Sequence, residues 1–587
     1  MIDSKVTRRV FLRGATVLSG GLLVQAAHRA APIAVAADEA TDRRDAGLIG
    51  HWPLAGDLRD HSSLDHATRA VDVELGQRGP RGKPATAARF NGRSSLLEVP
   101  DHSALKFDQG DLSLAAWLHT DERNADIVGN ILSKFDTRRR TGLQLYVLTN
   151  DGVTSTATAN SRQLSFGIDD GRSAGDWTDC GRPGNAVKVA ALSVVNGDLY
   201  AGTLETSAQE KGHLWRYAGG QQWIDLGNPL GANVVHSVTE FEGRLYCGVG
   251  RYNCSGSALG ETLNTTPGGK VFCVDPGGTW GDCGHPGLAG ATLESTPTKG
   301  YASGKADDVF DLTVYRGELY CVSNHRRNVF KYEGVQNWKN IGLDHRVLSL
   351  KVYRDKLYAL INGGPVYCYE GGSQWTLCGC PKGSTQTYGG IIYAGQLYVG
   401  TWPRGEVFRW DGGQEWVPVG RLGQEQEIMA MVLYNGKAYA GTLPLAEVYR
   451  YEESGQWTLL RRLDLTPDVR YRRVWSMATY QGQLFAGTLP TGRVWSLRAG
   501  AMVTWDRRLP GGWRHVAAVK DGRQLRLFLD GKEVADTSLQ PGVYNLSNQE
   551  PLQIGFGAYE HFDGLMSDVR LYNRALSAEE MAVLARI

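Results

Sequence analysis

GQLYVGT, residues 395–401, is a turn glycine followed by alternating apolar and small residues, a pattern typical of a short β-strand that leaves a tight turn. Six other stretches have the same form. They are GDLYAGT (197–203), GRLYCGV (243–249), GELYCVS (317–323), DKLYALI (355–361), GKAYAGT (436–442) and GQLFAGT (482–488). A segment that recurs seven times indicates a repeat architecture in the middle of the chain.

Each repeat continues into a second apolar segment, and most then reach a Gly-rich turn and a tryptophan, as in VFRW (407–410) before Trp416. Only six such tryptophans follow the seven cores. The seventh precedes the first core, because GDWTDCG around Trp177 resembles GTWGDCG around Trp280. A strand supplied from the opposite end of a repeat array closes a ring, so the pattern predicts seven four-stranded blades of a β-propeller. A stack of meanders in an open sandwich fits the displaced strand less well.

The innermost strand of each blade has its own periodicity. Seven residues before each turn stand Ala190, His236, Phe310, Leu348, Tyr388, Met429 and Trp475. The next position is small in every blade but one: Ala191, Ser237, Asp311, Ser349, Gly389, Ala430 and Ser476. Because neighbouring residues of a strand face opposite sides, the small set fits a crowded contact between blades. Asp311 is the exception, and a satisfied hydrogen-bonding role explains it better than catalysis.

Length and composition agree with an all-β protein of more than one domain. The chain has 587 residues, 74 of them glycine, and no long stretch of helical periodicity. Removing residues 1–36 takes away five of the 63 basic and one of the 62 acidic residues, which leaves 58 and 61. No basic run remains that would favour nucleic acid, and no second apolar segment of membrane-spanning length follows.

The first 36 residues are typical of a cleavable export signal. TRRVFLRG (7–14) precedes a short apolar segment and an Ala34-x-Ala36 site. Arg8-Arg9 followed by Val-Phe-Leu resembles the twin-arginine signal of prokaryotes. We therefore expect a periplasmic, cell-surface or extracellular product.

A second series of strands lies on both sides of the repeat. Near the C-terminus, WRHVAAV and LRLFL flank Asp521-Gly522, the strongest short-range signal for a hairpin. A lone hairpin is marginally stable and needs a larger sheet. Further strand-like stretches are GLIGHWPLAGDLRDHSS (47–63), AARFNGRSSLLEVPDHSALKF (87–107), LSLAAWLHTD (112–121), NILSKFD (130–136), LQLYVL (143–148), LQIGFG (552–557) and FDGLMSDVRLYNRALSAEEM (562–581).

Together these flanks resemble the laminin-G-like, concanavalin A-like jelly roll. The two ends of a propeller meet, so a whole ring can be inserted into one loop of another domain. The predicted domains are a signal peptide (1–36), a jelly roll in two parts (47–170 and 501–587) and a seven-bladed propeller between them (176–500). The resemblance implies carbohydrate binding, and calcium is a common feature of the family. Asp60 and Asp563 are candidate calcium ligands, although a turn-forming aspartate explains each equally well.

Nine cysteines are present, and disulfides persist in exported proteins. Cys273–Cys283 and Cys368–Cys378 have identical spacing about a Gly-rich turn, so we expect each pair to face across a hairpin and form a disulfide. Five cysteines remain, so at least one thiol stays free. A zinc site is disfavoured, because Cys378-x-Cys380 lacks a second ligand pair.

Three functions compete: carbohydrate binding, degradation of an acidic polysaccharide by a catalytic propeller, and a protein-interaction scaffold. The sialidase Arg-Ile-Pro signature is absent, and so is the Glu-x-Asp-x-x-Glu motif of jelly-roll glucanases. A lyase would need a base and a cation that neutralises a uronate carboxylate. Candidate catalytic residues of those types are His236, Arg251, Tyr252, His325 and Tyr388. Turnover is left open, and binding is the preferred interpretation.

The ligand site is expected where the innermost strands begin. The two longest inserts of the repeat, residues 250–270 and 284–305, reach the same face, and such loops tend to carry function. Aromatic faces combined with cations suit an acidic sugar. The predicted ligand-binding residues are His236, Arg251, Tyr252, His325, Arg326, Tyr388, Trp402, Arg404 and Trp475. The alternative is a solvated rim whose charges maintain solubility.

Overall fold

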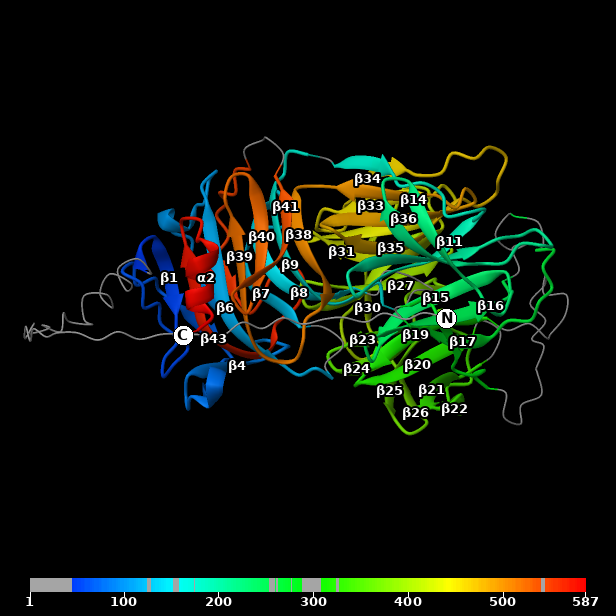
Figure 1. Cartoon of the computed structure of the whole chain (residues 1–587), viewed down its shortest axis with the longest axis horizontal. Coiled ribbons are helices and arrows are strands. Elements are labelled where there is room, and N and C mark those ends of the chain that lie inside the picture. The colour runs from blue at the N-terminus through cyan, green and yellow to red at the C-terminus, as the bar shows by residue number, and fades with distance from the viewer. Residues whose placement is uncertain are drawn as a thin grey trace, which may run out of the picture. The chain divides into compact units, whose positions relative to one another are not determined.

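The structure is a computed structural model that describes residues 45–586, except 124–127, 151–157, 174, 253–258, 260–261, 276, 288–307, 324–326 and 540–543. The predicted signal peptide lies outside the described residues. Residues 47–587 form one compact unit. It is almost entirely β-structure, as the glycine-rich, strand-like sequence predicts (Figure 1). Within the described part of the chain, no helix is long and apolar enough to cross a membrane.

Two antiparallel sheets form the jelly-roll sandwich, and their facing apolar side chains make one core. The first sheet contains β3 (Glu74–Gln77), β4 (Ala87–Asn91), β43 (Asp563–Tyr572), β6 (Leu112–Thr120), β39 (Gly512–Lys520), β40 (Gln524–Leu529) and β41 (Lys532–Ser538), with β1 (Leu48–Trp52) beside β43. The second contains β2 (Arg69–Val71), β5 (Leu96–Val99), β42 (Leu552–Ile554), β7 (Gly129–Asp136), β8 (Thr141–Asn150), β9 (Asn160–Asp170) and β38 (Ala501–Arg508). Helix α2 (Ala578–Leu584) follows, with a capping box at Ser577. Short 3-10 turns are η1 (Pro80–Gly82) and η2 (Ser103–Leu105).

Strands from both flanks alternate within these sheets. The hairpin β39–β40 pairs with β6, and Ala517 lies opposite Ala115. Strand β9 lies beside β38, with Ile168 opposite Ala501. The chain therefore leaves the sandwich after β9 and re-enters it in the neighbouring strand, and all blades of the propeller lie between these two points in the sequence.

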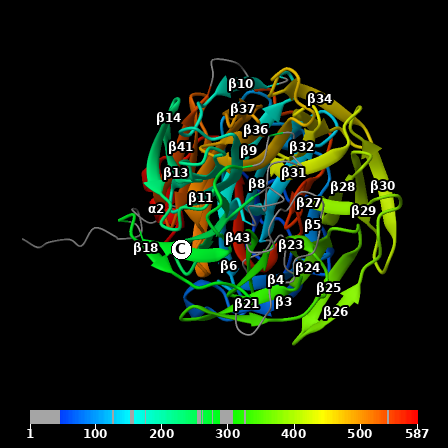
Figure 2. The same cartoon turned by 90° about the vertical axis from the view of Figure 1, so that its right-hand side faces the viewer.

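Seven antiparallel blades follow one another around a ring (Figure 2). Blade 1 is β11 (Lys188–Val195), β12 (Asp198–Leu204), β13 (Leu214–Gly219) and β14 (Gln222–Gly227). Blade 2 is β15 (Val234–Phe241), β16 (Arg244–Gly250), β17 (Lys270–Val274) and β18 (Trp280–Asp282). Blade 3 is β19 (Val309–Tyr315), β20 (Glu318–Ser323), β21 (Val329–Gly334) and β22 (Asn337–Asn340). Blades 4 and 5 are β23 (Val347–Tyr353), β24 (Lys356–Ile361), β25 (Val366–Gly371), β26 (Gln374–Leu377); and β27 (Gln386–Tyr393), β28 (Gln396–Trp402), β29 (Glu406–Trp410), β30 (Trp416–Arg421).

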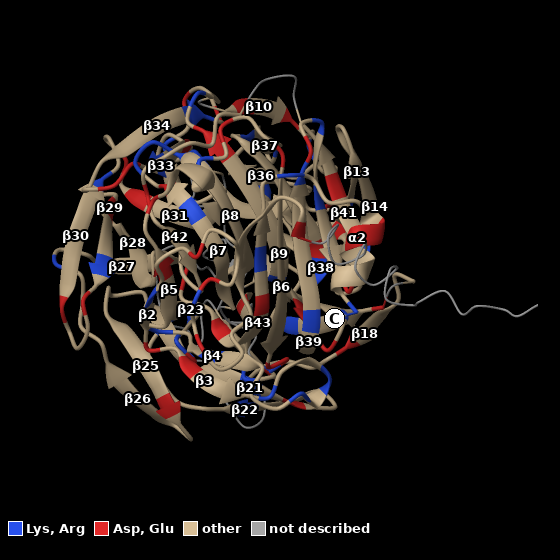
Figure 3. Cartoon of the chain, turned by 90° about the vertical axis from the view of Figure 1, so that its left-hand side faces the viewer, with Lys and Arg blue, Asp and Glu red and all other residues tan. Residues whose placement is uncertain are grey.

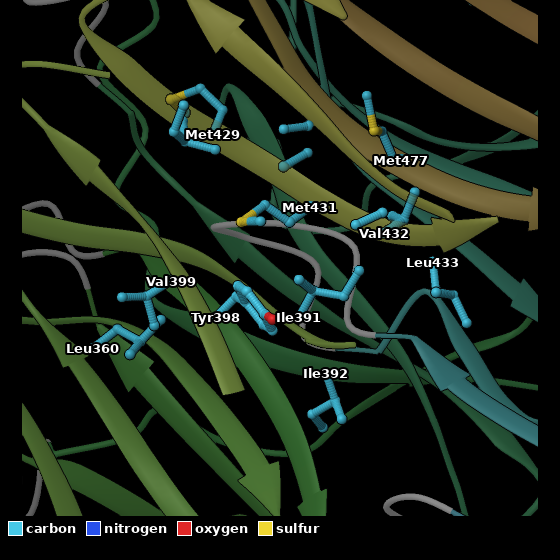
Figure 4. Packing of buried hydrophobic residues seen from close by; sticks show 14 of the residues in the cluster. Leu360, Ile391, Ile392, Tyr398, Val399, Met429, Met431, Val432, Leu433 and Met477 are labelled. Atoms are coloured by element: carbon cyan, nitrogen blue, oxygen red, sulfur yellow. The ribbon is translucent and has the colours of Figure 1, made fainter. Parts of the chain in front are cut away.

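Blade 6 is β31 (Glu427–Tyr434), β32 (Lys437–Leu443), β33 (Glu447–Tyr451) and β34 (Trp457–Arg462). Blade 7 is β35 (Arg473–Tyr480), β36 (Gln483–Leu489) and β37 (Val494–Arg498), and its outer strand is β10 (Asp176–Asp179) from the other end of the repeat. Trp177 lies opposite Leu497, so the displaced tryptophan marks the closing strand as predicted. Side chains between the blades form the largest apolar cluster, of which Figure 4 shows Ile391, Tyr398 and Met431.

A β-bulge interrupts each innermost strand close to its beginning. In blade 2 the register shifts between Val235 and Ser237, and the extra residue is His236. In blade 7 it is Trp475. The small residue that follows bonds to the neighbouring blade: the Ser476 hydroxyl donates to the Val189 carbonyl at 2.9 Å. Asp311 accepts the Leu350 N–H of blade 4 at 2.7 Å, which is the hydrogen-bonding role that the sequence favoured for it. Bulges redirect side chains, here at the position where each blade approaches the axis.

The turns after the innermost strands contact the jelly roll. The Asn435 side chain donates to the carbonyls of Ile168 and Ala499, both at 3.0 Å. Gly436 has φ +78°, and a Cβ there would lie 2.0 Å from the Gln144 amide nitrogen. Only glycine therefore fits this turn against the sandwich. The jelly roll thus packs on the turn ends of the blades, and the beginnings of the innermost strands lie at the opposite ends.

Candidate functional site

Charged side chains occupy one repeated position, nine residues before each turn, where the innermost strands begin. In order around the ring the residues are Lys188, Val234, Asp308, Arg346, Gln386, Glu427 and Arg473. Five of the seven are charged, three positive and two negative. Lys188 and Asp308 are fully buried, and Glu427 is 3 % exposed. Buried charges require partners, so the contacts of this position are informative.

Lys188, His236 and Asp308 form a buried chain of hydrogen bonds across three blades. The Asp308 carboxylate lies 2.7 Å from Nδ1 of His236, and the Lys188 ammonium lies 3.1 Å from Nε2. Burial lowers the pKa of His236 to about 4, against the opposing charge of Asp308. The imidazole is therefore neutral at pH 7, donates from Nδ1 to Asp308, and accepts from Lys188 at Nε2.

Aromatic rings enclose the Lys188 ammonium. Its Nζ lies 3.8 Å from the ring centroid of Trp475 and 4.0 Å from that of Tyr252, distances that give cation–π attraction. His236 packs edge-on against Phe310, with 4.4 Å between ring centroids. The backbone of Tyr252 is held by Asn233, which donates to the Tyr252 carbonyl and accepts its N–H, both at 2.8 Å. The insert after β16 thus contributes Tyr252 to the site.

A second group comes from blades 5 to 7. Burial raises the pKa of Glu427 to about 7, while the Arg473 guanidinium and a hydrogen bond from Tyr388 oppose the rise. Burial, and then the charge of Glu427, raise the pKa of Tyr388 well above its ordinary value. Among the described residues, Oε1 of Glu427 and Nε of Arg473 are buried without a hydrogen-bond partner. The Arg473 guanidinium also lies over Trp475 at 5.1 Å, which connects the two groups. We call Lys188, Tyr252, His236, Asp308, Tyr388, Glu427, Arg473 and Trp475 the axial cluster.

Aromatic and basic residues continue outward from the axial cluster. Arg473 and Arg470 lie over the Tyr471 ring at 5.8 and 4.7 Å, and Tyr471 meets Trp402 edge-on with 6.2 Å between centroids. Arg404 lies further out and pairs with Glu406 at 3.1 Å. Trp402 thus packs against the aromatic residues that lead outward from the axial cluster. Arg404 forms an ion pair with Glu406 instead.

The structure brings together four predicted site residues: His236, Tyr252, Tyr388 and Trp475. Arg251 is the half-buried neighbour of Tyr252. The predictions at His325 and Arg326 lie outside the described residues. The sequence analysis missed Lys188, Asp308, Glu427 and Arg473. The signal that could have found them is the frequent charge nine residues before each turn of the repeat. The sequence analysis examined only the positions seven and six residues before the turn.

The two candidate calcium ligands have different partners. Asp60 accepts four hydrogen bonds, from the N–H groups of His51, Ser62 and His66 and from the Ser62 hydroxyl. These bonds hold the carboxylate within its own turn, which is the turn-forming role that the sequence offered as the alternative to calcium binding. Asp563 pairs with Arg89 at 2.6 Å. Within the described ranges, no group of three or more acidic, histidine or cysteine side chains is arranged to hold a metal ion. Calcium binding stays a prediction.

The cysteine pairs do not lie directly opposite each other, which corrects the expected register. Cys273 faces Gly281 and Cys368 faces Thr376, so in each hairpin the second cysteine lies two residues beyond the residue that faces the first. Cys283 is therefore a diagonal neighbour of Cys273 across its hairpin, and Cys378 is a diagonal neighbour of Cys368. All four thiols are buried and unbonded in this structure. Burial, and then a hydrogen bond with Cys273, raise the pKa of Cys283 to about 12. The disulfides stay a prediction.

Comparison with known proteins supports the jelly roll. Residues 478–582 match the family model of the concanavalin A-like lectin/glucanases superfamily, and the match runs from β35 of the last blade into α2. No curated protein matches the sequence. Similar solved structures include the WD40 β-propeller domain of Doa1, at 12 % identity and TM-score 0.35, covering 55 % of this chain and 97 % of that one. A protein of unknown function from Bacteroides thetaiotaomicron has 9 % identity and TM-score 0.34, with coverages of 74 % and 98 %.

Proposed function

We propose that the protein is exported and binds an acidic polysaccharide at the axial cluster. The observation that carries the proposal is a pair of buried polar atoms without hydrogen-bond partners, Oε1 of Glu427 and Nε of Arg473. The Arg473 guanidinium lies over the Trp475 ring. A buried polar atom without a partner is costly, and a ligand that supplies the partner removes the cost. A sugar hydroxyl can donate to Glu427, and a uronate or sulfate oxygen can accept from Arg473.

The concanavalin A-like segment supports the same class of ligand through the second domain, because that superfamily contains lectins. Export rests on the twin-arginine-like N-terminus. The sugar ligand would stack on the outer aromatics, Trp402 and Tyr471, since Trp475 is only 1 % exposed.

Degradation of the polysaccharide is the second candidate, and one observation favours it. Tyr388 lies within electrostatic reach of Arg346 and Arg473, which places a phenolic acid or base beside two cations that would neutralise a uronate. His236 is a weaker candidate for the base, since its Nε2 already accepts from Lys188 and its side chain is fully buried. A scaffold role is the third candidate, and no contact among the described residues supports it.

A glycan array followed by a product assay separates these functions. We expect binding to acidic glycans, with no rise in reducing ends or in unsaturated product absorbance for a binding protein. Tyr388→Phe removes the hydroxyl that bonds to Glu427, and Arg251→Ala removes a rim cation; each should weaken affinity several-fold. Arg523→Ala, an exposed arginine in the turn after β39 that is outside the predicted ligand-binding set, is the control. Parental affinity in both site variants would place the ligand elsewhere, with the jelly roll as the next region to test.

A further inference from the structure

Outside the axial cluster, a charged cleft of about 540 Å³ lies between jelly-roll loops and the turns of blades 3 and 4. Its size is in the range of small-ligand sites. Five arginines line it: Arg89, Arg93, Arg123, Arg316 and Arg354. Four carboxylates line it as well: Asp121, Asp355, Glu560 and Asp563. Basic and acidic residues are also interspersed over the neighbouring strands in Figure 3.

Most of these charges form pairs. Arg316 forms a bidentate pair with Asp355, with Nε–Oδ1 at 2.9 Å and Nη2–Oδ2 at 2.6 Å. Arg89 pairs with Asp563 at 2.6 Å. The side chains of the Arg316 pair are more than half exposed. Exposed pairs of this kind are weak, so a ligand anion can share their guanidinium groups at little cost.

Two guanidinium groups have unused donors. Within the described residues, Arg93 has no carboxylate partner at its side chain, which is exposed. Arg354 donates to the Gly395 carbonyl at 2.7 Å and its Nε lies 4.0 Å from Glu560, while its side chain remains 35 % exposed at the cleft. The five cations exceed the four anions by one, so a single negative charge would balance the cleft. No aromatic ring is among the described lining residues, so recognition here would be by charge rather than by stacking.

We propose that this cleft is a second binding site, specific for an oxyanion such as a sulfate or carboxylate group on a saccharide. Arg93 and Arg354 hold the oxyanion through charge-assisted hydrogen bonds, for which the planar guanidinium is suited. Because the lining comes from both the sandwich and the propeller, the bound anion also links them. The proposal is independent of the axial cluster, which shares no residue with the cleft.

Titration with inorganic sulfate, by calorimetry and by thermal unfolding, tests the proposal on the full-length protein. We expect saturable binding and a rise in the unfolding temperature for the parent and for Arg523→Glu, a matched charge reversal in the exposed turn after β39. Arg93→Glu should lower sulfate affinity at least tenfold. Arg93 is exposed, so this variant should fold as the parent does, which its far-ultraviolet circular dichroism checks.

Polymer probes identify the chemistry. Dextran sulfate should compete with inorganic sulfate, and dextran of the same length should not. Polygalacturonate in place of dextran sulfate distinguishes a carboxylate from a sulfate ligand, and competition by either supports the site. Equal sulfate affinity in Arg93→Glu and the parent would overturn the proposal, and so would equal competition by neutral dextran. The Tyr388→Phe variant should bind sulfate at the cleft unchanged, so failure of the axial site would be seen separately.

Discussion

The buried carboxyl of Glu427 makes the stability of the protein depend on pH in a predictable direction. Its pKa is raised from an ordinary 4.5 to about 7 because burial disfavours the ionised form. The folded state therefore holds this proton more tightly than the unfolded state does. Below pH 4.5 the carboxyl is protonated in both the folded and the unfolded state, so its burial does not lower the free energy of unfolding. As the pH rises from 4.5 to about 7, the folded protein loses stability progressively, and above that range the full cost remains.

The size of the effect follows from the shift. About 2.5 pKa units at about 1.4 kcal/mol each amount to roughly 3.5 kcal/mol in the limit of high pH. Glu427→Gln keeps the side-chain shape and an acceptor for the Tyr388 hydroxyl, but it cannot ionise. The free energy of unfolding of the parent, relative to that of the variant, should therefore fall by about 3 kcal/mol between pH 4.5 and pH 8.

Urea unfolding of both proteins at several pH values measures this difference. Glu415→Gln is the matched control, because that carboxylate is exposed in the same part of the ring and should show no such change. If the gap between the parent and Glu427→Gln is the same at pH 5 and pH 8, Glu427 is ionised throughout that range, held by Arg473. The argument from burial would then be refuted.

Three further predictions concern the architecture. Replacing residues 176–500 by a short Gly/Ser linker should leave a folded jelly roll, because β9 and β38 are neighbours; loss of β-sheet circular dichroism would contradict a nested domain. Asn435→Ala removes two buried hydrogen bonds to the sandwich and should cost about 1–3 kcal/mol in denaturant unfolding, whereas Asn196→Ala at the equivalent exposed turn should cost much less. Peptide mapping of exported protein under non-reducing conditions should find Cys273 bonded to Cys283, and free thiols at both would reject the pairing.

The repeat made most of the fold predictable. Alternation in segments such as GQLYVGT predicts the strands, and the displaced Trp177 predicts the closing strand, because both signals are local and recur seven times. The cysteine register was not predictable in the same way. Both hairpins pair with each cysteine two residues out of register with its expected partner, and equal spacing about a turn does not reveal such an offset.

The site was partly predictable for a related reason. His236, Tyr252 and Trp475 were found because aromatic and basic residues at strand starts and in long inserts stand out in the sequence. Lys188 and Asp308 belong to different repeats, 120 positions apart, and each looks like an ordinary polar residue at the start of a strand. Only the bulge that brings His236 inward shows that they share one imidazole.

The axial cluster depends on closure of the ring. Lys188 belongs to the first blade and Trp475 to the last, so the cation–π contact between them crosses the point where the ring closes. Closure is secured at some distance from the cluster, by the pairing of β10 with β37 and by the Arg493–Asp179 ion pair at 2.6 Å. Near the axis, the Ser476–Val189 hydrogen bond joins the same two blades. Residues on both sides of this closure thus support the site without touching a ligand, because the Lys188 ammonium loses one of its aromatic partners if the two blades separate.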